Sequence, residues 1–254
     1  MTEVQRHYEQ LLARHYTWMV GDFESAVGEQ RRLLESLGVN GPGGSTTDVA
    51  VDLGAGPGYQ SFALADLGYR RVVAIDSSAE LLAELSARRR SRTGIETVLG
   101  DFCDELRRRV EPSIAAVVVC MGDTLLLLPS KAAVATLFQD VFAVLAPGGV
   151  FVATYRDLSA ELTGLDRFIP LRADADRIML CFLECENAET LRVHDLIYVR
   201  SDDGWQPHKS SYPKLRLSPR WVESSLEAAG FSIRHHAPSP AGLWATVATR
   251  DRVR

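Results

Sequence analysis

Residues 49–60 have the sequence VAVDLGAGPGYQ. The apolar run up to Leu53 predicts a strand, and the closely spaced glycines Gly54, Gly56 and Gly58 predict a tight turn that leads into a helix. This order of strand, glycine turn and helix brings the backbone close to a nucleotide-like ligand. The stretch therefore predicts an α/β fold with a ligand site at the end of its first core strand.

The charge at this turn distinguishes two classes of ligand. A dinucleotide site holds pyrophosphate on the helix N-terminus, where the carboxylate of Asp52 would repel it. The third glycine of the dinucleotide pattern would also fall at Tyr59, whereas it stands one residue earlier, at Gly58. A carboxylate at Asp52 suits a cofactor with a cationic end, such as the ammonium and sulfonium of S-adenosylmethionine.

Two further acids follow the next two predicted strands. Asp76 lies 20 residues beyond Gly56, where a carboxylate can accept both ribose hydroxyls. Asp101 is placed to meet an adenine amino group, with Phe102 packed on the ring. Either acid alone is explained equally well as a helix cap. Acids at the carboxyl ends of the first three strands, around one glycine turn, favour a nucleotide site.

Short apolar runs alternate with helical segments from residue 48 onward, which predicts a parallel sheet with crossover helices. The predicted strands are 48–53, 71–76, 95–99, 114–120 and 149–154, and the helices are 58–68, 78–90 and 130–145. Upstream, the pattern predicts two helices, the second over 23–37. Downstream, three strand-like stretches at 176–186, 190–200 and 204–214 predict an antiparallel meander. A helix from Ser218 to Gly230 and strands at 231–236 and 242–249 complete the chain.

We therefore divide the chain into three parts. Residues 1–47 form an N-terminal helical lid, rich in aromatic residues, over the cofactor. Residues 48–154 and 218–254 form the cofactor-binding core, and residues 155–217 form an inserted antiparallel lid over the substrate. In the first part, we expect Tyr16 and Trp18 to touch the cofactor.

The motifs resemble those of the class I S-adenosylmethionine-dependent methyltransferases. VDLGAGPG is similar to their first motif, VVAIDSS to their second-strand acid, LGDF to their adenine loop and LAPGGVFVAT to their turn into the fifth strand. The resemblance covers residues 48–154 and 218–249. It implies a Rossmann-like, seven-stranded, mostly parallel sheet of order 3-2-1-4-5-7-6 with the seventh strand antiparallel. The inserted strands resemble the lid sheet of small-molecule members such as the glycine N-methyltransferase group.

The resemblance implies S-adenosyl-L-methionine as cofactor and S-adenosyl-L-homocysteine as product. The contacts it assigns are Asp52, Gly54, Ala55, Gly56, Asp76, Ser77, Asp101, Phe102, Met121 and Gly122. The motifs identify the cofactor well and the methyl acceptor poorly.

Three segments are expected to reach the acceptor over the carboxyl ends of the strands. Asp123 is a candidate to orient an amine or accept a proton, and Arg156 to clamp a substrate carboxylate. His194 is the preferred general base, with His208 next. Each candidate also has a purely structural alternative. Asp123 is equally explained as a loop cap, Arg156 as part of a surface ion pair, and His194 and His208 as packing residues.

The amino-acid composition disfavours some classes of binding partner. Lys and Arg number 28 against 33 Asp and Glu, a formal charge of −5, which argues against nucleic acid or an anionic membrane. The 4 cysteines lack metal-ligand spacing, so we expect no metal site and a cytoplasmic, reduced protein. We expect a monomer or homodimer that methylates an oxygen or nitrogen of a small molecule. The open alternatives are an RNA or protein methyltransferase, a nicotinamide-dependent oxidoreductase and a non-catalytic S-adenosylmethionine-binding module.

Overall fold

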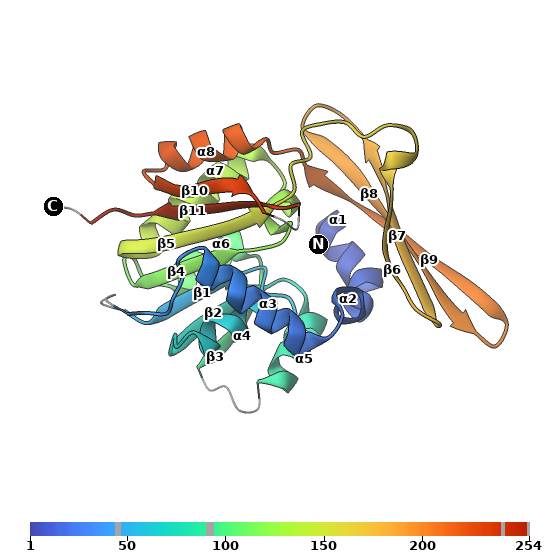
Figure 1. Ribbon diagram of the computed structural model, residues 1–254, viewed down its shortest axis with the longest axis horizontal. Helices are drawn as coiled ribbons and strands as arrows, with labels where there is room; N and C mark the ends of the chain where they lie inside the picture. The colour runs from blue at the N-terminus through green and yellow to red at the C-terminus, as the bar shows by residue number, and fades with distance from the viewer. Residues whose placement is uncertain (44–46, 90–93, 240–241, 253–254) are drawn as a thin grey trace.

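A seven-stranded sheet forms the centre of the core domain (Figure 1). The computed structural model describes residues 1–43, 47–89, 94–239 and 242–252. The strand order is β10-β11-β5-β4-β1-β2-β3, with β11 antiparallel to β5 and the β3, β2, β1, β4 and β5 pairs parallel. The strands are β1 (Val49–Leu53), β2 (Arg71–Asp76), β3 (Ile95–Leu99), β4 (Ala115–Cys120), β5 (Leu145–Tyr155), β10 (Ser232–Pro238) and β11 (Trp244–Thr249). This order confirms the predicted 3-2-1-4-5-7-6 topology.

Helices cover both faces of this sheet, because its central strands are apolar on both sides. Val51 and Leu53 point to one face and Ala50 to the other, as the two-residue period of a strand requires. On the Ala50 face lie α3 (Phe23–Ser36), α4 (Tyr59–Asp66) and α5 (Ala79–Arg88). On the opposite face lie α6 (Phe102–Arg109), α7 (Lys131–Val144) and α8 (Pro219–Ala228).

Two local features of the core differ from the sequence prediction. Helix α6 was not predicted, because its sequence, FCDELRRR, is mostly polar. Leu106 is its one buried residue, so the helix has no apolar periodicity. Strand β5 begins at Leu145 rather than at Gly149, so the predicted Pro-Gly-Gly turn lies within the strand. The pairing of β5 with β4 shifts register between Ala115 and Val117. A bulge therefore accommodates the two glycines without ending the strand.

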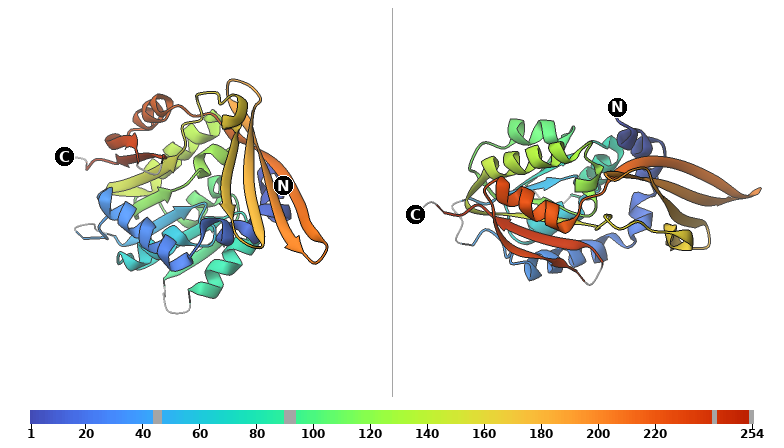
Figure 2. Two further views of the ribbon diagram at one scale, coloured as in Figure 1. Left: turned by 45° about the vertical axis from the view of Figure 1, so that its right-hand side comes forward. Right: turned by 90° about the horizontal axis from the view of Figure 1, so that it is seen from above.

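A second, four-stranded antiparallel sheet stands beside the core and extends away from it (Figure 2). It contains β6 (Phe168–Ala173), β7 (Arg177–Cys185), β8 (Thr190–Ser201) and β9 (Gly204–Leu215), in that order. The three predicted strands of the meander are present. Strand β6 was not predicted, because Pro170 interrupts a short and mostly exposed segment. We call this sheet the inserted sheet.

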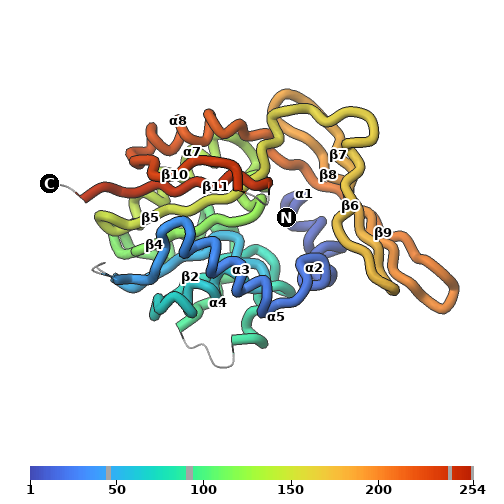
Figure 3. Tube along the Cα trace, in the orientation of Figure 1, coloured from blue at the N-terminus to red at the C-terminus, as the bar shows by residue number. Residues whose placement is uncertain are grey.

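The N-terminal segment lies between the core and the inserted sheet (Figures 1 and 3). It consists of α1 (Glu3–His7), a π-helical turn (Tyr8–Leu12) and α2 (Ala13–Val20). The buried His7 ring stacks on Tyr212 of β9 with centroids 4.3 Å apart, and its Nε2 lies 3.0 Å from the Asp195 carboxylate of β8. These contacts hold α1 against the inserted sheet. Among the described residues, no helix combines the length and apolar character needed to cross a bilayer.

Candidate active site

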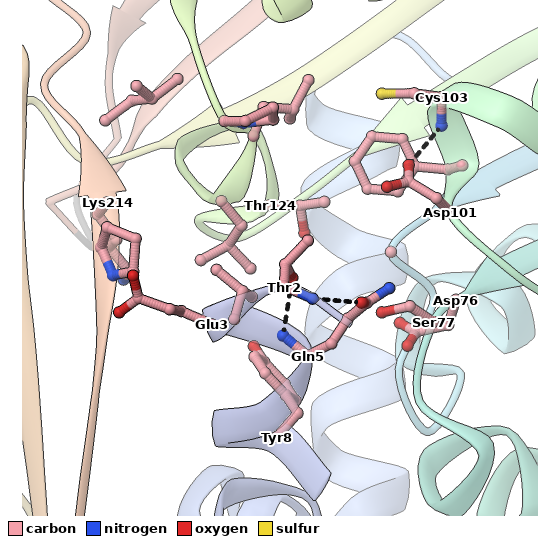
Figure 4. Close-up of a pocket in the computed structure, with 18 of the residues that line it drawn as sticks. Thr2, Glu3, Gln5, Tyr8, Asp76, Ser77, Asp101, Cys103, Thr124 and Lys214 are labelled. Atoms are coloured by element: carbon pink, nitrogen blue, oxygen red, sulfur yellow. Dashed lines mark hydrogen bonds between the residues drawn. The ribbon is translucent and has the colours of Figure 1, made fainter.

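A cleft of about 1270 Å³, partly open to solvent, lies between the carboxyl ends of the core strands, α1 and β9 (Figure 4). One end, which we call the core end, is lined by Gly54, Gly56, Asp76, Ser77, Asp101 and Phe102. The other, which we call the insert end, is lined by Leu127, Leu128, Pro129, Pro213, Lys214 and Leu215. Between the two ends, the N-terminal segment contributes Thr2, Glu3, Gln5 and Tyr8, and Tyr16 also reaches the wall.

The glycine turn and Asp76 form one unit at the core end. The Gly56 N–H donates to Asp76 Oδ2 at 2.8 Å, and the Ser78 N–H donates to Oδ1 at 2.7 Å. Burial raises the pKa of Asp76, and these backbone donors partly oppose the rise. A Cβ added at Gly54 would lie 2.5 Å from the Thr124 side chain, and Gly54 has a φ of +74°. The turn therefore requires glycine there, and the backbone holds Asp76 at the cleft.

Asp101 both caps a helix and lines the cleft. Its carboxylate accepts the Cys103 N–H at 2.9 Å and so caps the N-terminus of α6. It also lines the cleft beside Phe102. One carboxylate can therefore cap α6 and line the cleft at the same time.

Asp52 lies behind the cleft and does not line it. Its side chain is 1% exposed and accepts the Ser61 hydroxyl at 2.6 Å. The strand period directs Asp52 to the face that α4 covers, so a direct contact with a cationic cofactor is not supported. Burial raises its pKa to about 7, partly opposed by the Ser61 hydrogen bond. Three other expected cofactor contacts, Ala55, Met121 and Gly122, also lie off the described cleft wall.

Of the two aromatic residues expected to touch the cofactor, Tyr16 lines the cleft and Trp18 does not. The Trp18 indole N–H donates to the Asp174 carboxylate, and the Arg177 guanidinium lies 4.9 Å from the centre of its ring. Residues two apart on a helix point about 200° apart around its axis. Trp18 consequently packs on the inserted sheet while Tyr16 faces the core.

His194 points away from the cleft. Along β8, Val193, Asp195 and Ile197 are buried and face the N-terminal segment, whereas His194 lies on the alternate, outer face. Its Nε2 is 2.9 Å from the Glu184 carboxylate, also on that outer face. His208 is exposed on β9. The position of His194 gives no support to its role as a general base.

Asp123 and Arg156 form an ion cluster with Lys214, which the sequence analysis did not select. Lys214 Nζ lies 2.7 Å from Asp123 Oδ2, and the Arg156 guanidinium pairs with the same carboxylate. Burial alone would raise the pKa of Asp123, but Lys214 and Arg156 reverse this effect and hold the pKa below its ordinary value. The Asp123 side chain is therefore an ionised carboxylate at neutral pH, and its low pKa makes it a poor proton acceptor.

Lys214 and Tyr8 are the wall residues whose importance the sequence analysis missed. Lys214 stands two residues after Tyr212, so the strand period places both on one face. That signal was available in the sequence. Tyr8 reaches the cleft because the π-helical turn places it there, which no pattern in the sequence indicates.

Comparison with known proteins shows which proteins the chain resembles. Residues 50–149 match the family model described as a methyltransferase domain. No curated protein sequence matches the chain. A structure of an S-adenosylmethionine-dependent methyltransferase from Clostridium acetobutylicum ATCC 824 is similar over 98% of each chain, with a TM-score of 0.72 and 15% identity.

Two other similar structures have sugar-related names. CalS10 from Micromonospora echinaspora, an amino pentose methyltransferase solved with S-adenosylmethionine bound, is 17% identical, with a TM-score of 0.70 over 91% of this chain and 93% of its own. The sugar N-methyltransferase KedS8 from Streptoalloteichus sp ATCC 53650 is 16% identical, with a TM-score of 0.68 over 91% of this chain and 89% of its own.

Residues 50–149 thus form a methyltransferase domain within a class I fold. The whole chain is similar in fold to S-adenosylmethionine-dependent methyltransferases. The core end fits this cofactor: it offers two carboxylates, an aromatic ring and the bare backbone of Gly56, where an added Cβ would have no neighbour closer than 4.0 Å. The open space at Gly56 allows a ligand to approach the turn closely.

Replacing His194 tests its position directly. We expect His194→Ala to change methyl transfer from labelled S-adenosylmethionine into small molecules of a cell extract by less than twofold, because the ring faces away from the cleft. The same variant should bind S-adenosylhomocysteine as the wild type does in calorimetry. A tenfold fall in transfer with unchanged cofactor affinity would restore His194 as a base.

Proposed function

We propose that the protein methylates an oxygen or nitrogen atom of a small-molecule acceptor bound at the insert end of the cleft. The observation that carries the proposal is the position of α1 and β9, which close over the carboxyl ends of the core strands. The cleft has to hold both cofactor and acceptor between the core strands, α1 and β9, which favours a compact acceptor. The amino pentose and sugar substrates in the names of CalS10 and KedS8 are consistent with this proposal.

The residues of the cleft have separate tasks in this proposal. Asp76 and Asp101 hold the ribose and adenine, with Phe102 against the ring, while Gly54 and Gly56 admit the cofactor to the turn. When bound, S-adenosylmethionine supplies a methyl group on a sulfonium that is a good leaving group. The protein then mainly aligns the acceptor atom and excludes water, and α1 and β9 serve both purposes.

Charge and cysteine chemistry support the remaining parts of the proposal. A formal charge of −5 disfavours nucleic acid and anionic membranes as partners. The four cysteines are free thiols, as expected in the cytoplasm. We propose a cytoplasmic monomer or homodimer.

A methyl-transfer experiment tests the acceptor class. The enzyme is incubated with S-adenosylmethionine carrying a tritiated methyl group and with three fractions of a cell extract: compounds below 1 kDa, RNA and protein. We expect label in the small-molecule fraction at least tenfold above that in either macromolecular fraction, because α1 and β9 lie over the carboxyl ends of the core strands and narrow access to the cleft. Asp76→Ala serves as the control without cofactor binding.

Label that appears mainly in RNA or protein would overturn the proposal in favour of a macromolecular methyltransferase. Cofactor binding without label in any fraction would favour a non-catalytic S-adenosylmethionine-binding module. Salt-sensitive binding of RNA would independently support an RNA substrate.

A further inference from the structure

The insert end of the cleft combines an apolar wall with one fixed cation. Leu127, Leu128 and Pro129 approach from the core side, and Pro213 and Leu215 flank Lys214 on β9. Lys214 is only 12% exposed through its side chain, and Figure 4 shows it at the edge of the cleft. This wall fits an acceptor with an apolar body and one polar group.

The carboxylates near this end already have cationic partners. Asp123 is paired with Lys214 and Arg156. Glu3, which lines the cleft, lies 2.8 Å from the Arg192 guanidinium. A protonated amine entering here would therefore find no carboxylate free of a cation among the described residues at the insert end.

Hydrogen-bond donors, in contrast, face the cleft. An ammonium group has three N–H donors, and Asp123 takes one of those of Lys214. The Tyr8 hydroxyl points into the cleft, and burial raises its pKa well above the ordinary value, so it stays a donor. The part of the cleft wall that the structure describes contains no histidine.

We propose that the acceptor is an apolar compound that presents an anionic oxygen, a carboxylate or an acidic phenol, to Lys214 and Tyr8. The inference rests on the proposed function and names its substrate class. An acceptor that is already anionic needs no general base, which agrees with the donor-rich wall. The acceptor oxygen forms the bond to the methyl carbon, the carbon–sulfur bond breaks with its electron pair moving to sulfur, and no proton is transferred.

An alkylamine acceptor meets two obstacles at the same place. It enters as an ammonium ion, which the Lys214 charge repels. It must also lose a proton before its nitrogen can attack, and Asp123 is held as a committed anion by two cations. The geometry therefore favours methylation of oxygen over nitrogen.

Three probes with a propylphenyl body test this at about pH 8, where the first two are anions and the third is a cation: 4-propylbenzoate, 2,6-dichloro-4-propylphenol and 4-propylbenzylamine. Each is titrated calorimetrically into the full-length enzyme saturated with S-adenosylhomocysteine. We expect the benzoate or the phenol to bind at least tenfold tighter than the amine, and the tighter of the two identifies the source of the oxygen. Lys214→Met should remove most of this difference, because the ligand loses its charged donor.

Matched variants keep the result interpretable. Lys131→Met removes a lysine that is paired with Glu189 outside the cleft and should leave the selectivity unchanged. Because Lys214→Met leaves Asp123 with one cation, the double variant Asp123→Asn/Lys214→Met removes both charges and should lose selectivity in the same way. Unfolding curves and affinity for S-adenosylhomocysteine show whether each variant retains its fold.

The outcomes separate this inference from the proposed function. If the amine binds as tightly as the two anionic probes, if neither anionic probe binds, or if Lys214→Met retains the selectivity, the anionic-oxygen acceptor is wrong. If the wild type fails to bind S-adenosylhomocysteine at all, the methyltransferase function itself fails.

Discussion

Asp76→Ala is expected to weaken binding of S-adenosylhomocysteine by about 100-fold or more. The carboxylate lies at the core end and is held there by the N–H groups of Gly56 and Ser78. Two charge-assisted hydrogen bonds to ribose hydroxyls contribute about 3 kcal/mol or more, which corresponds to about 100-fold in affinity. Isothermal titration calorimetry of wild type and variant, with S-adenosylmethionine as a second ligand, measures the change.

Two further variants separate the carboxylate's contact with ligand from its support of the turn. Asp104→Ala, on the exposed first turn of α6, removes a nearby acid outside the cleft and should leave the affinity unchanged. Asp76→Asn keeps an oxygen acceptor for the backbone and should show an intermediate loss. Retained affinity in Asp76→Ala, or binding of NAD(H) by the wild type, would contradict the assignment of this site.

Asp52→Asn is expected to stabilise the protein progressively as the pH rises from about 4 to 7. Burial raises the pKa of the folded-state Asp52 to about 7, whereas an unfolded aspartate titrates near about 4. Below pH 4 the carboxyl is neutral in both states, so its burial is least unfavourable there. Between about pH 4 and 7 the unfolded state loses its proton while the folded state keeps it, so the wild type is progressively destabilised until the folded carboxyl also ionises. The gap of about 3 pKa units between the folded and unfolded states corresponds to a loss of about 4 kcal/mol in the free energy of unfolding of the wild type.

Urea unfolding at pH 4 to 8 measures this difference. The amide keeps an oxygen that accepts the Ser61 hydroxyl and has no charge to bury, so the variant should gain on the wild type across the window. Glu80→Gln, on the exposed side of α5, is the matched control and should show no such trend. A constant difference between Asp52→Asn and the wild type over this pH range would show that Asp52 is not titrating.

The predictions for the core succeeded where they depended on short-range patterns. The VAVDLGAGPGYQ stretch, the alternation of strands with helices and the Ser218-Pro219 helix start each indicate one local structure. The resemblance supplied the strand order, which the structure confirms. Asp76 lies at the cleft because it is the last residue of a parallel strand, and the carboxyl ends of such strands form the edge where ligands bind.

The predictions that failed depended on the direction of a side chain. The sequence analysis selected both Tyr16 and Trp18, of which only Tyr16 lines the cleft, and it selected His194, whereas the neighbouring Asp195 is the residue of β8 that points inward. In each case the sequence analysis identified the helix or strand correctly, but it did not identify which side of that element faces the cleft. A helix or strand that packs on two sides has no hydrophobic pattern strong enough to define which polar residue turns inward.

The amino-acid sequence by itself determined the class I core, the glycine turn and the position of Asp76, because glycine conformations and strand-end acids act within a few residues of one another. Only the tertiary structure decided the insert end of the cleft. Lys214, Asp123 and Arg156 come from three distant segments and meet only when the inserted sheet folds over the core. An ion cluster of this kind depends on distances between elements, and sequence spacing does not contain those distances.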